Sequence, residues 1–145
     1  SFLGEIRECE GKINEFNAVR PISDRAKEML SLVNGEEIAF ARKENMKHLM
    51  ALLDGKVKMV PGLNRSWYYA PFSLPILVED RDNVQRLLAQ NGVYASVLWS
   101  ICDEARNVCT NSAYVADHML SLPIDQRYDW DDMEMIAEIV CNCTK

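Results

Sequence analysis

The chain has 145 residues, with 16 Lys and Arg against 22 Asp and Glu, and its formal net charge is −6. Hydrophobic residues make up 48% and charged residues 26%, as is typical of a globular protein with one domain. No apolar run reaches the roughly 20 residues of a membrane helix, and an acidic chain without a basic stripe is poorly suited to nucleic acid. We therefore expect neither a membrane nor a nucleic acid as a partner.

The N-terminus and the cysteines predict the compartment. The first residues lack the basic stretch, the apolar stretch and the small-residue cleavage site of a signal peptide. Five cysteines are an odd number in a chain large enough to fold without disulfides, so we expect reduced thiols. Both features predict a cytoplasmic protein. Because the chain begins with Ser1 rather than methionine, we expect a processed chain or a fragment.

The first part of the chain is predicted to be helical. Apolar residues recur at spacings of three and four over residues 2–16, and Ser23 can cap a following helix. The apolar face of that second helix consists of Ala26, Met29, Leu30 and Val33. Asn34-Gly35 is expected to break or bend the helix. The periodicity resumes over residues 36–53 until Asp54-Gly55 ends it.

Three later stretches alternate apolar and other residues with the period of a strand: residues 57–60, 67–78 and 93–99. The longest of them places Pro71 and Pro75 on alternate positions. Since amides at alternate positions point to the same lateral side of a strand, both missing donors fall on one side. We expect an edge or an irregular stretch of pairing there.

Helices and loops connect these strands. One helix is predicted to be capped by Asp80 or Asp82 and to stop at Gly92 in the left-handed conformation. The remaining predictions are a loop over 102–112, a helix over 113–120, an extended stretch over 122–124 and a terminal helix capped by Asp129. The fold class is therefore α+β: a small mixed, mainly antiparallel sheet covered by helices, with a long N-terminal lead-in helix.

The residue types that most often carry chemistry favour structural roles in this sequence. The cysteines considered as metal ligands are Cys102, Cys109, Cys141 and Cys143. They lack the C-x-x-C spacing of a zinc site and have no neighbouring base, so we predict no metal and no catalytic thiol. His48 is expected on a solvated helix face and His118 in a packing role. The acidic cluster over 129–134 is expected to stabilise the first turn of a helix.

Three stretches of the sequence together resemble a known family. Residues 22–30 lead into Arg42-Lys43, Asn45 and Leu49, which is similar to a linker helix with an R-R/K-x-N-x-x-x-L pattern. Residues 69–94 resemble the strand and helix that follow in that family. Residues 120–128 read L-S-L-P-I-D-Q-R-Y, similar to a closing L-S-L-P-x-D-x-R-Y run. On these motifs the chain resembles the DegT-type aminotransferases that modify sugars, from about Ile22 onward.

The resemblance implies a fold-type-I enzyme that uses pyridoxal phosphate to move an amino group from glutamate to a nucleotide-linked keto sugar. In that family the cofactor and its Schiff-base lysine lie in a large N-terminal domain, and the cofactor supplies the chemistry. No lysine of this chain lies in that context. The resemblance therefore implies no catalytic residue, no cofactor-binding residue and no cofactor for this chain alone.

The resemblance also implies a division of the chain and one site residue. Residues 1–22 would be an extension or a remnant of the preceding domain, 23–54 one or two linker helices, and 55–145 a small α/β domain. Val97-Leu98-Trp99-Ser100 matches the place where the family often has v-h-Y or v-h-W near the substrate, although Leu98 replaces the commoner histidine. Trp99 is the substrate-cleft candidate.

We therefore expect the C-terminal domain of a sugar aminotransferase, inactive without its N-terminal domain. Because whole members of the family are dimers and a separated domain exposes former interface, we also expect self-association through the lead-in helices. One alternative is a free-standing binding or regulatory domain that keeps the fold without catalysis. The other is a metal or redox module that uses the cysteines.

Overall fold

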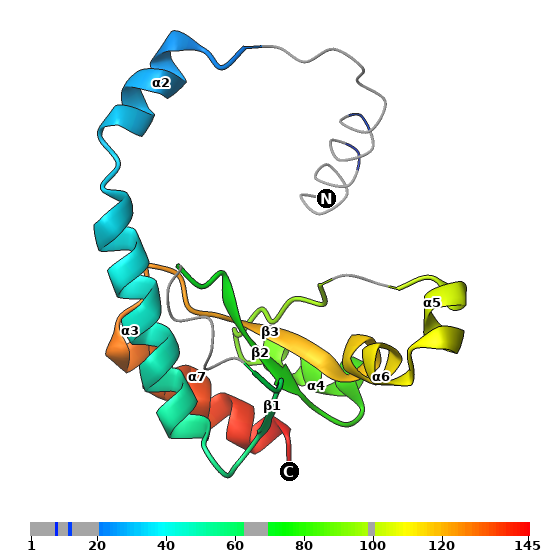
Figure 1. Ribbon diagram of the computed structural model, residues 1–145. Helices are drawn as coiled ribbons and strands as arrows, with labels where there is room; N and C mark the ends of the chain where they lie inside the picture. The colour runs from blue at the N-terminus through cyan, green and yellow to red at the C-terminus, as the bar shows by residue number, and fades with distance from the viewer. Residues whose placement is uncertain (1–7, 9–11, 13–20, 63–69, 99–100) are drawn as a thin grey trace. The chain divides into compact units, whose positions relative to one another are not determined.

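The computed structural model describes residues 8, 12, 21–62, 70–98 and 101–145. In these residues it contains six helices and a three-stranded antiparallel sheet (Figure 1). The chain divides into two compact units, Ser1–Val33 and Asn34–Lys145. The predicted α+β class with a long lead-in helix is confirmed. In the part of the chain that the structure describes, no helix is both long and apolar enough to cross a membrane.

The first unit contains helix α2, Asp24–Ser31. The predicted cap is confirmed, because the Ser23 hydroxyl accepts a hydrogen bond from the Ala26 N–H at 3.2 Å. No side chain of α2 is buried. Its apolar residues Met29 and Leu30 are 62% and 60% exposed.

The second unit begins with helix α3, Gly35–Leu53. Asn34 caps it, since its Oδ1 accepts hydrogen bonds from the N–H groups of Glu36 and Glu37. At its end Gly55 has a φ of +68°, a conformation that favours glycine. Both the predicted break at Asn34-Gly35 and the predicted stop at Asp54-Gly55 are therefore confirmed.

The sheet has the order β1 (Lys58–Met59), β2 (Ser73–Leu77) and β3 (Met119–Pro123). In the register of β2 and β3, Leu74 lies opposite Leu122 and Ile76 lies opposite Leu120. The long strand predicted over 67–78 is shorter than expected, because pairing begins only two residues after Pro71. Residues 63–69 lie outside the described part of the chain.

Pro75 explains why β1 is so short. Its partner Ser121 turns its N–H and C=O away from β2, toward Ser96, so Pro75 makes no ladder hydrogen bond to β3. The Pro75 carbonyl instead accepts from the N–H of Val60 at 3.5 Å. The missing donor of Pro75 therefore faces β1, where the ladder ends at Met59. The predicted irregular pairing is confirmed, although β2 is the central strand.

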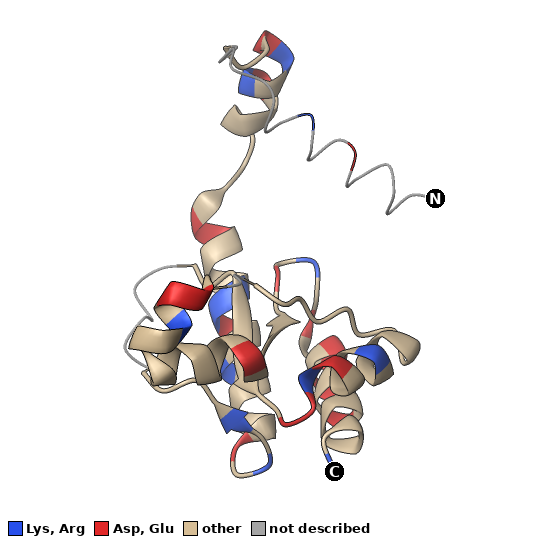
Figure 2. Cartoon of the chain, turned by 90° about the vertical axis from the view of Figure 1, so that its right-hand side faces the viewer, with Lys and Arg blue, Asp and Glu red and all other residues tan. Residues whose placement is uncertain are grey.

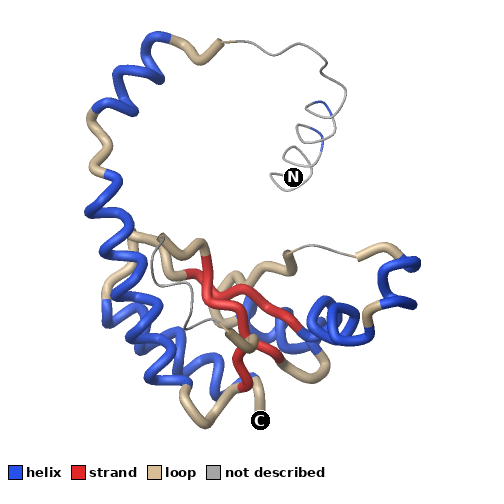
Figure 3. Tube along the Cα trace, viewed as in Figure 1, coloured by secondary structure: helices blue, strands red, loops and turns tan. Residues whose placement is uncertain are grey.

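One core joins the sheet to three helices: α3, α4 (Arg81–Gln90) and α7 (Trp130–Cys143) (Figure 3). The fully buried side chains include Leu49 and Leu53 of α3, Leu74 and Ile76 of β2, Leu120 and Leu122 of β3, Leu88 of α4, and Met133 and Val140 of α7. Since Leu74, Ile76, Leu120 and Leu122 are paired across β2 and β3, they share one face of the sheet. The three helices cover that face.

The ends of α4 and α7 follow the local signals in the sequence. Gly92 has a φ of +84°, and the hydrogen bonds from Val93 N–H to Leu88 O and from Gly92 N–H to Ala89 O form a Schellman motif. Asp129 and Asp132 form a capping box at the start of α7. Both predicted ends are confirmed. The predicted cap of α4 is wrong, because Asp80 stands at the N-cap position in the left-handed conformation, with a φ of +48°, and its side chain makes no cap hydrogen bond, while Asp82 lies in the first turn.

The stretch between α4 and β3 differs from its predicted structure. Residues 93–98 form only an isolated bridge between Ser96 and Ser121, so the predicted strand over 93–99 is wrong in its described part. The Ala95 carbonyl is one reason, because it accepts a hydrogen bond from the Gln85 side chain at 2.9 Å instead of joining a ladder. The third strand is β3, formed by residues 119–123.

Helices α5 (Asp103–Val108) and α6 (Thr110–His118) occupy the region that was predicted to be a loop over 102–112 and a helix over 113–120. The polar sequence of α5 carries no apolar periodicity, and its acidic first turn and an ion pair between Arg106 and Asp117 at 2.8 Å stabilise it instead. The predicted helix end at Leu120 is also wrong. Leu120 is fully buried in β3 because its side chain joins the core.

Candidate functional site

The first and the third motif stretches meet at the turn before α7. Asn45 of α3 is only 3% exposed, and its Nδ2 donates to the carbonyl of Asp125 at 3.1 Å and to that of Tyr128 at 2.9 Å. The side-chain amide thus uses both N–H groups on backbone carbonyls 80 and 83 residues away. This contact fixes the turn over 125–128 against the lead-in helix.

Arg42, one turn before Asn45, connects the remaining motif stretch. Its Nε donates to Gln126 Oε1 at 2.9 Å, and one of its terminal nitrogens donates to the Pro71 carbonyl at 3.4 Å. Pro71 belongs to the second stretch and Gln126 to the third. Arg42 and Asn45 therefore join, in one cluster, all three stretches on which the resemblance rests.

Asp125, the acidic residue of this turn, has a strongly lowered pKa. The Arg127 guanidinium donates to both of its carboxylate oxygens, from Nε at 2.9 Å and from a terminal nitrogen at 2.7 Å. These hydrogen bonds, together with the backbone N–H of Arg127 and the charge of Arg42, lower the pKa of Asp125 to about 2. The same pair raises the pKa of Arg127.

Replacing Asp125 by asparagine is expected to change how stability depends on pH. Because the folded pKa of Asp125 lies below its ordinary value of 3.8, its contribution is fully present above that value and is lost as the pH falls to about 2. The Arg127 side chain is 76% exposed, so we expect a contribution of only about 1 kcal/mol. Urea unfolding of both proteins across this window measures the difference between their unfolding free energies. A difference that stays constant across the window would contradict the prediction.

Trp99, the substrate-cleft candidate, lies outside the described residues. Its described neighbours Leu98 and Ile101 line an apolar hollow of about 420 Å³ together with α6 and β3. The other residues that line this hollow are Asn111, Ser112, Val115, Ala116 and Met119. The role of Trp99 stays a prediction.

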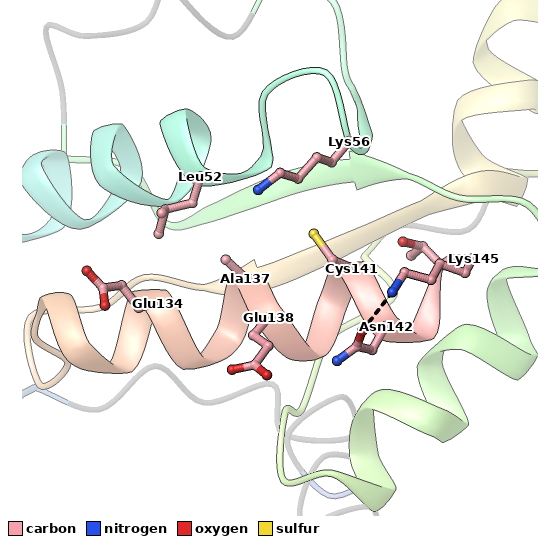
Figure 4. A pocket seen from close by; sticks show the side chains of 9 residues that line it. Leu52, Lys56, Glu134, Ala137, Glu138, Cys141, Asn142 and Lys145 are labelled. Atoms are coloured by element: carbon pink, nitrogen blue, oxygen red, sulfur yellow. Dashed lines mark hydrogen bonds between the residues drawn. The ribbon is translucent and has the colours of Figure 1, made fainter.

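A larger hollow of about 810 Å³ lies between the end of α3 and helix α7 (Figure 4). It is lined by Leu52, Lys56, Glu134, Ala137, Glu138, Cys141, Asn142, Thr144 and Lys145. The Lys56 ammonium and the Cys141 thiol point into the space between the two segments, and Lys145 donates to Asn142 at 3.0 Å (Figure 4). No sequence motif indicates this hollow, because its residues come from segments that lie far apart in the chain.

A second cluster missed by the sequence analysis surrounds Tyr114 of α6. The His118 ring stacks on Tyr114 with ring centroids 4.0 Å apart, and its Nε2 lies 3.2 Å from a Glu79 carboxylate oxygen. The Tyr114 hydroxyl donates to Glu79 at 3.3 Å and accepts from Lys58 at 3.3 Å. The predicted packing role of His118 is confirmed. The cluster attaches α6 to β1 and to the end of β2.

The prediction for His48 is wrong. Its side chain is 23% exposed, stacks on Trp130 with ring centroids 4.8 Å apart, and places Nε2 3.6 Å from a Glu134 carboxylate oxygen. The charged neighbours of His48 in the sequence favoured a solvated face. The packing of α3 against α7 instead covers the ring.

The described cysteines and carboxylates do not gather into a metal site. No group of three His, Cys, Asp or Glu residues in the described part of the chain is placed to hold a metal ion. The four cysteines described, Cys102, Cys109, Cys141 and Cys143, are free. Hydrogen bonding by Ser112 lowers the pKa of the exposed Cys109 thiol.

Acidic and basic residues are interspersed over the helices of the second unit (Figure 2).

Comparison with known proteins gives no match to a family model and no match among curated proteins. Among solved structures, the chain is similar to a DegT DnrJ EryC1 StrS aminotransferase from Brucella abortus, with a TM-score of 0.59 and 20% identity over 75% of this chain and 32% of that one. It is also similar to the sugar aminotransferase CalS13 from Micromonospora echinospora, with a TM-score of 0.61 and 21% identity over 74% and 31% of the two chains. At these identities the likeness shows the fold.

The two comparisons bear directly on the predicted resemblance. The chain spans about a third of the length of each of these aminotransferases, while most of its own length is matched. The predicted resemblance to DegT-type aminotransferases is therefore confirmed in the fold. The matched region is one part of each of these two longer aminotransferase chains.

Proposed function

We propose that this chain is the small C-terminal domain of a pyridoxal-phosphate-dependent sugar aminotransferase, which transfers an amino group to a nucleotide-linked keto sugar. The observation that supports this most is the fold that three quarters of the chain shares with about a third of two aminotransferases. The cluster around Arg42 and Asn45 adds support, because it gives a structural reason for the three motif stretches to occur together.

The residues of this chain do not fit the cofactor. A lysine that forms a Schiff base needs a desolvated or cationic pocket that lowers its pKa. Three lysines, Lys12, Lys27 and Lys47, pair with carboxylates and are 66%, 57% and 51% exposed. Lys58 and Lys145 are also exposed and donate to Tyr114 and Asn142. We infer that the cofactor is anchored in a preceding domain and that this chain alone does not transaminate.

In the proposed enzyme each segment of the chain has a different role. Residues 1–22 belong to, or extend from, the preceding domain, and residues 23–54 connect it to the small domain over 55–145. The small domain closes one side of the substrate cleft, with Trp99 on the cleft wall. The N-terminal cofactor domain is the main partner.

The proposal is tested by adding pyridoxal phosphate to the purified chain, reducing with borohydride and searching every lysine by mass spectrometry for the pyridoxyl group. We expect no modified lysine and no visible absorption band of protein-bound cofactor, because no lysine of this chain is buried: six are exposed and Lys43 is half-buried. The longer protein that includes the preceding domain is the control, and we expect a modified lysine there, upstream of Ser1. A lysine of this chain that is modified specifically would contradict the proposal.

We also expect the isolated chain to self-associate through its lead-in helices. Leu30 and Leu32 are 60% and 82% exposed, and covering apolar surface of this kind is favourable. Size-exclusion chromatography over a range of concentrations is expected to show a dimer that dissociates on dilution. Leu30→Glu should shift the profile to monomer, whereas Ser31→Glu adds the same charge outside the apolar stripe and should not. A monomer at every concentration would refute this expectation.

A further inference from the structure

The sequence contains two Asn-Gly pairs, Asn34-Gly35 and Asn91-Gly92. In such a pair the peptide nitrogen of glycine can attack the side-chain amide carbon of the preceding asparagine. Glycine permits this attack best, because it has no Cβ to hinder the approach and the greatest backbone freedom. The two pairs share the same chemistry but differ in their surroundings, so each serves as a comparison for the other.

The nucleophile is free in the first pair. Gly35 is the first residue of α3, and its N–H is one of the helix donors that have no intrahelical partner. It makes no hydrogen bond to any described residue. Asn34 and Gly35 are both exposed, and a Cβ built on Gly35 meets no atom within 4 Å beyond its chain neighbours and the adjoining backbone of α3. The Gly35 nitrogen can therefore approach the Asn34 side chain without losing a hydrogen bond of its own, and only the first turn of α3, where Ile38 N–H donates to the Asn34 carbonyl at 3.2 Å, has to adjust.

The electrophile of the first pair is polarised. Asn34 Oδ1 accepts hydrogen bonds from the N–H groups of Glu36 at 3.1 Å and Glu37 at 3.3 Å. Attack on the amide carbon develops negative charge on this oxygen. Two backbone donors at the positive end of the α3 dipole already point at it.

The second pair is protected at both positions. The Gly92 N–H donates to the Ala89 carbonyl at 3.1 Å within the Schellman motif, so the nucleophile is occupied. The Asn91 Nδ2, which would have to leave, donates to the Leu87 carbonyl at 2.9 Å. Reaction at Asn91 therefore requires the end of α4 to open first.

We propose that Asn34 is a site of spontaneous deamidation. The Gly35 nitrogen forms a bond to Asn34 Cγ and loses its proton to water, while the Cγ–Nδ2 bond breaks and ammonia leaves, so that a succinimide ring closes. Water then opens the ring at either carbonyl and leaves aspartate or isoaspartate at position 34. The sequence consumes one water and releases one ammonia, and it needs no oxidant or cofactor.

The position of the site gives the modification its effect. Asn34 is both the cap of α3 and the first residue of the second compact unit. The aspartate product keeps a capping oxygen and adds a negative charge at a helix N-terminus, which is favourable. The isoaspartate product inserts a methylene into the backbone between Val33 and Gly35 and withdraws the cap. The modification thus acts at the start of α3, next to the boundary between the two units.

The test uses the whole chain, incubated at physiological temperature and mildly alkaline pH and then digested with trypsin. Peptide 28–42 contains Asn34 and peptide 87–106 contains Asn91. We expect the first to gain the mass of an amide-to-acid exchange about tenfold faster than the second, because only the second site must open a hydrogen-bonded helix end. Isoaspartate in peptide 28–42, detected by an isoaspartate-specific methyltransferase, is expected together with the mass change.

A substitution at Gly35 and a measurement in urea test the two causes separately. Gly35→Ala, which fits without a clash, is expected to slow the reaction about tenfold while α3 stays helical, since alanine hinders the nitrogen and favours the helix. In concentrated urea the two wild-type sites are expected to react at similar rates. Equal rates at the two sites in the folded chain, or an unchanged rate in Gly35→Ala, would overturn the proposal. A difference that persists undiminished in urea would also overturn it, because the cause would not be the fold.

Discussion

Replacing Asn45 by alanine is expected to lower the free energy of unfolding by about 2–3 kcal/mol. The side chain is 3% exposed and supplies the hydrogen bonds to the carbonyls of Asp125 and Tyr128. Its removal leaves both carbonyls without these donors and opens a small cavity beside the middle of α3. An unsatisfied buried acceptor costs more than the net worth of the hydrogen bond that it lost. Urea unfolding followed by circular dichroism measures the change.

Two further variants separate the hydrogen bonds from the volume of the side chain. Asn45→Asp keeps the size but replaces both donors with a carboxylate facing two carbonyls, so we expect it to be at least as destabilising as alanine. Lys47→Ala changes an exposed ion-paired residue of the same helix and is expected to cost less than about 0.5 kcal/mol. If Asn45→Ala also stays within that margin, the side chain does not fix the turn.

Leu49→Ala is expected to lower the free energy of unfolding by about 3 kcal/mol. Leu49 is fully buried in the core that α3 shares with α7 and the sheet. Removing its terminal carbons costs the transfer free energy of the lost atoms and leaves a cavity that rigid neighbours fill only in part. The variant therefore measures how far α3 belongs to the folded unit rather than serving as a connection to another domain.

The matched control is Leu32→Ala, which removes the same atoms from a side chain that is 82% exposed in the first unit. We expect its effect to stay within about 0.5 kcal/mol. Thermal or urea unfolding of both variants under one set of conditions makes the comparison. If α3 only tethered the sheet to a preceding segment, the two substitutions would have similar small effects.

The features predicted correctly from the sequence are those fixed by neighbouring residues. Ser23, Asp129 and Gly92 act within one turn of their own positions, through a side-chain oxygen or a left-handed backbone. The alternation that predicted β2 is similarly local. The fold class followed from the order of such elements.

The errors concern features that depend on distant partners. The pattern over 93–99 fits a strand, but its described residues pair with β3 only at Ser96 and give the Ala95 carbonyl to Gln85. Helix α5 is polar and is stabilised by an ion pair across eleven residues, which apolar periodicity does not detect. The environment of His48 is determined by Trp130, more than eighty positions later in the chain.

The candidate site was predictable only in part. The motif residues Arg42 and Asn45 stood out in the sequence through resemblance, yet nothing in their spacing indicated that they bind the turn over 125–128. Trp99 rests on the resemblance alone. The cluster of Lys58, Glu79, Tyr114 and His118 brings together three separate segments, so no local pattern in the sequence indicates it.

The contact of Asn45 with a turn 80 residues away has a consequence for how the protein folds. Helix α3 comes first and α7 last in the sequence of the second unit, yet the two helices pack together and each covers apolar surface of the other. Closing so long a loop lowers the conformational entropy of the chain before the stabilising contacts form. Such distant pairings therefore slow folding. During synthesis, the surface of α3 that packs against α7 therefore stays uncovered until α7 has left the ribosome.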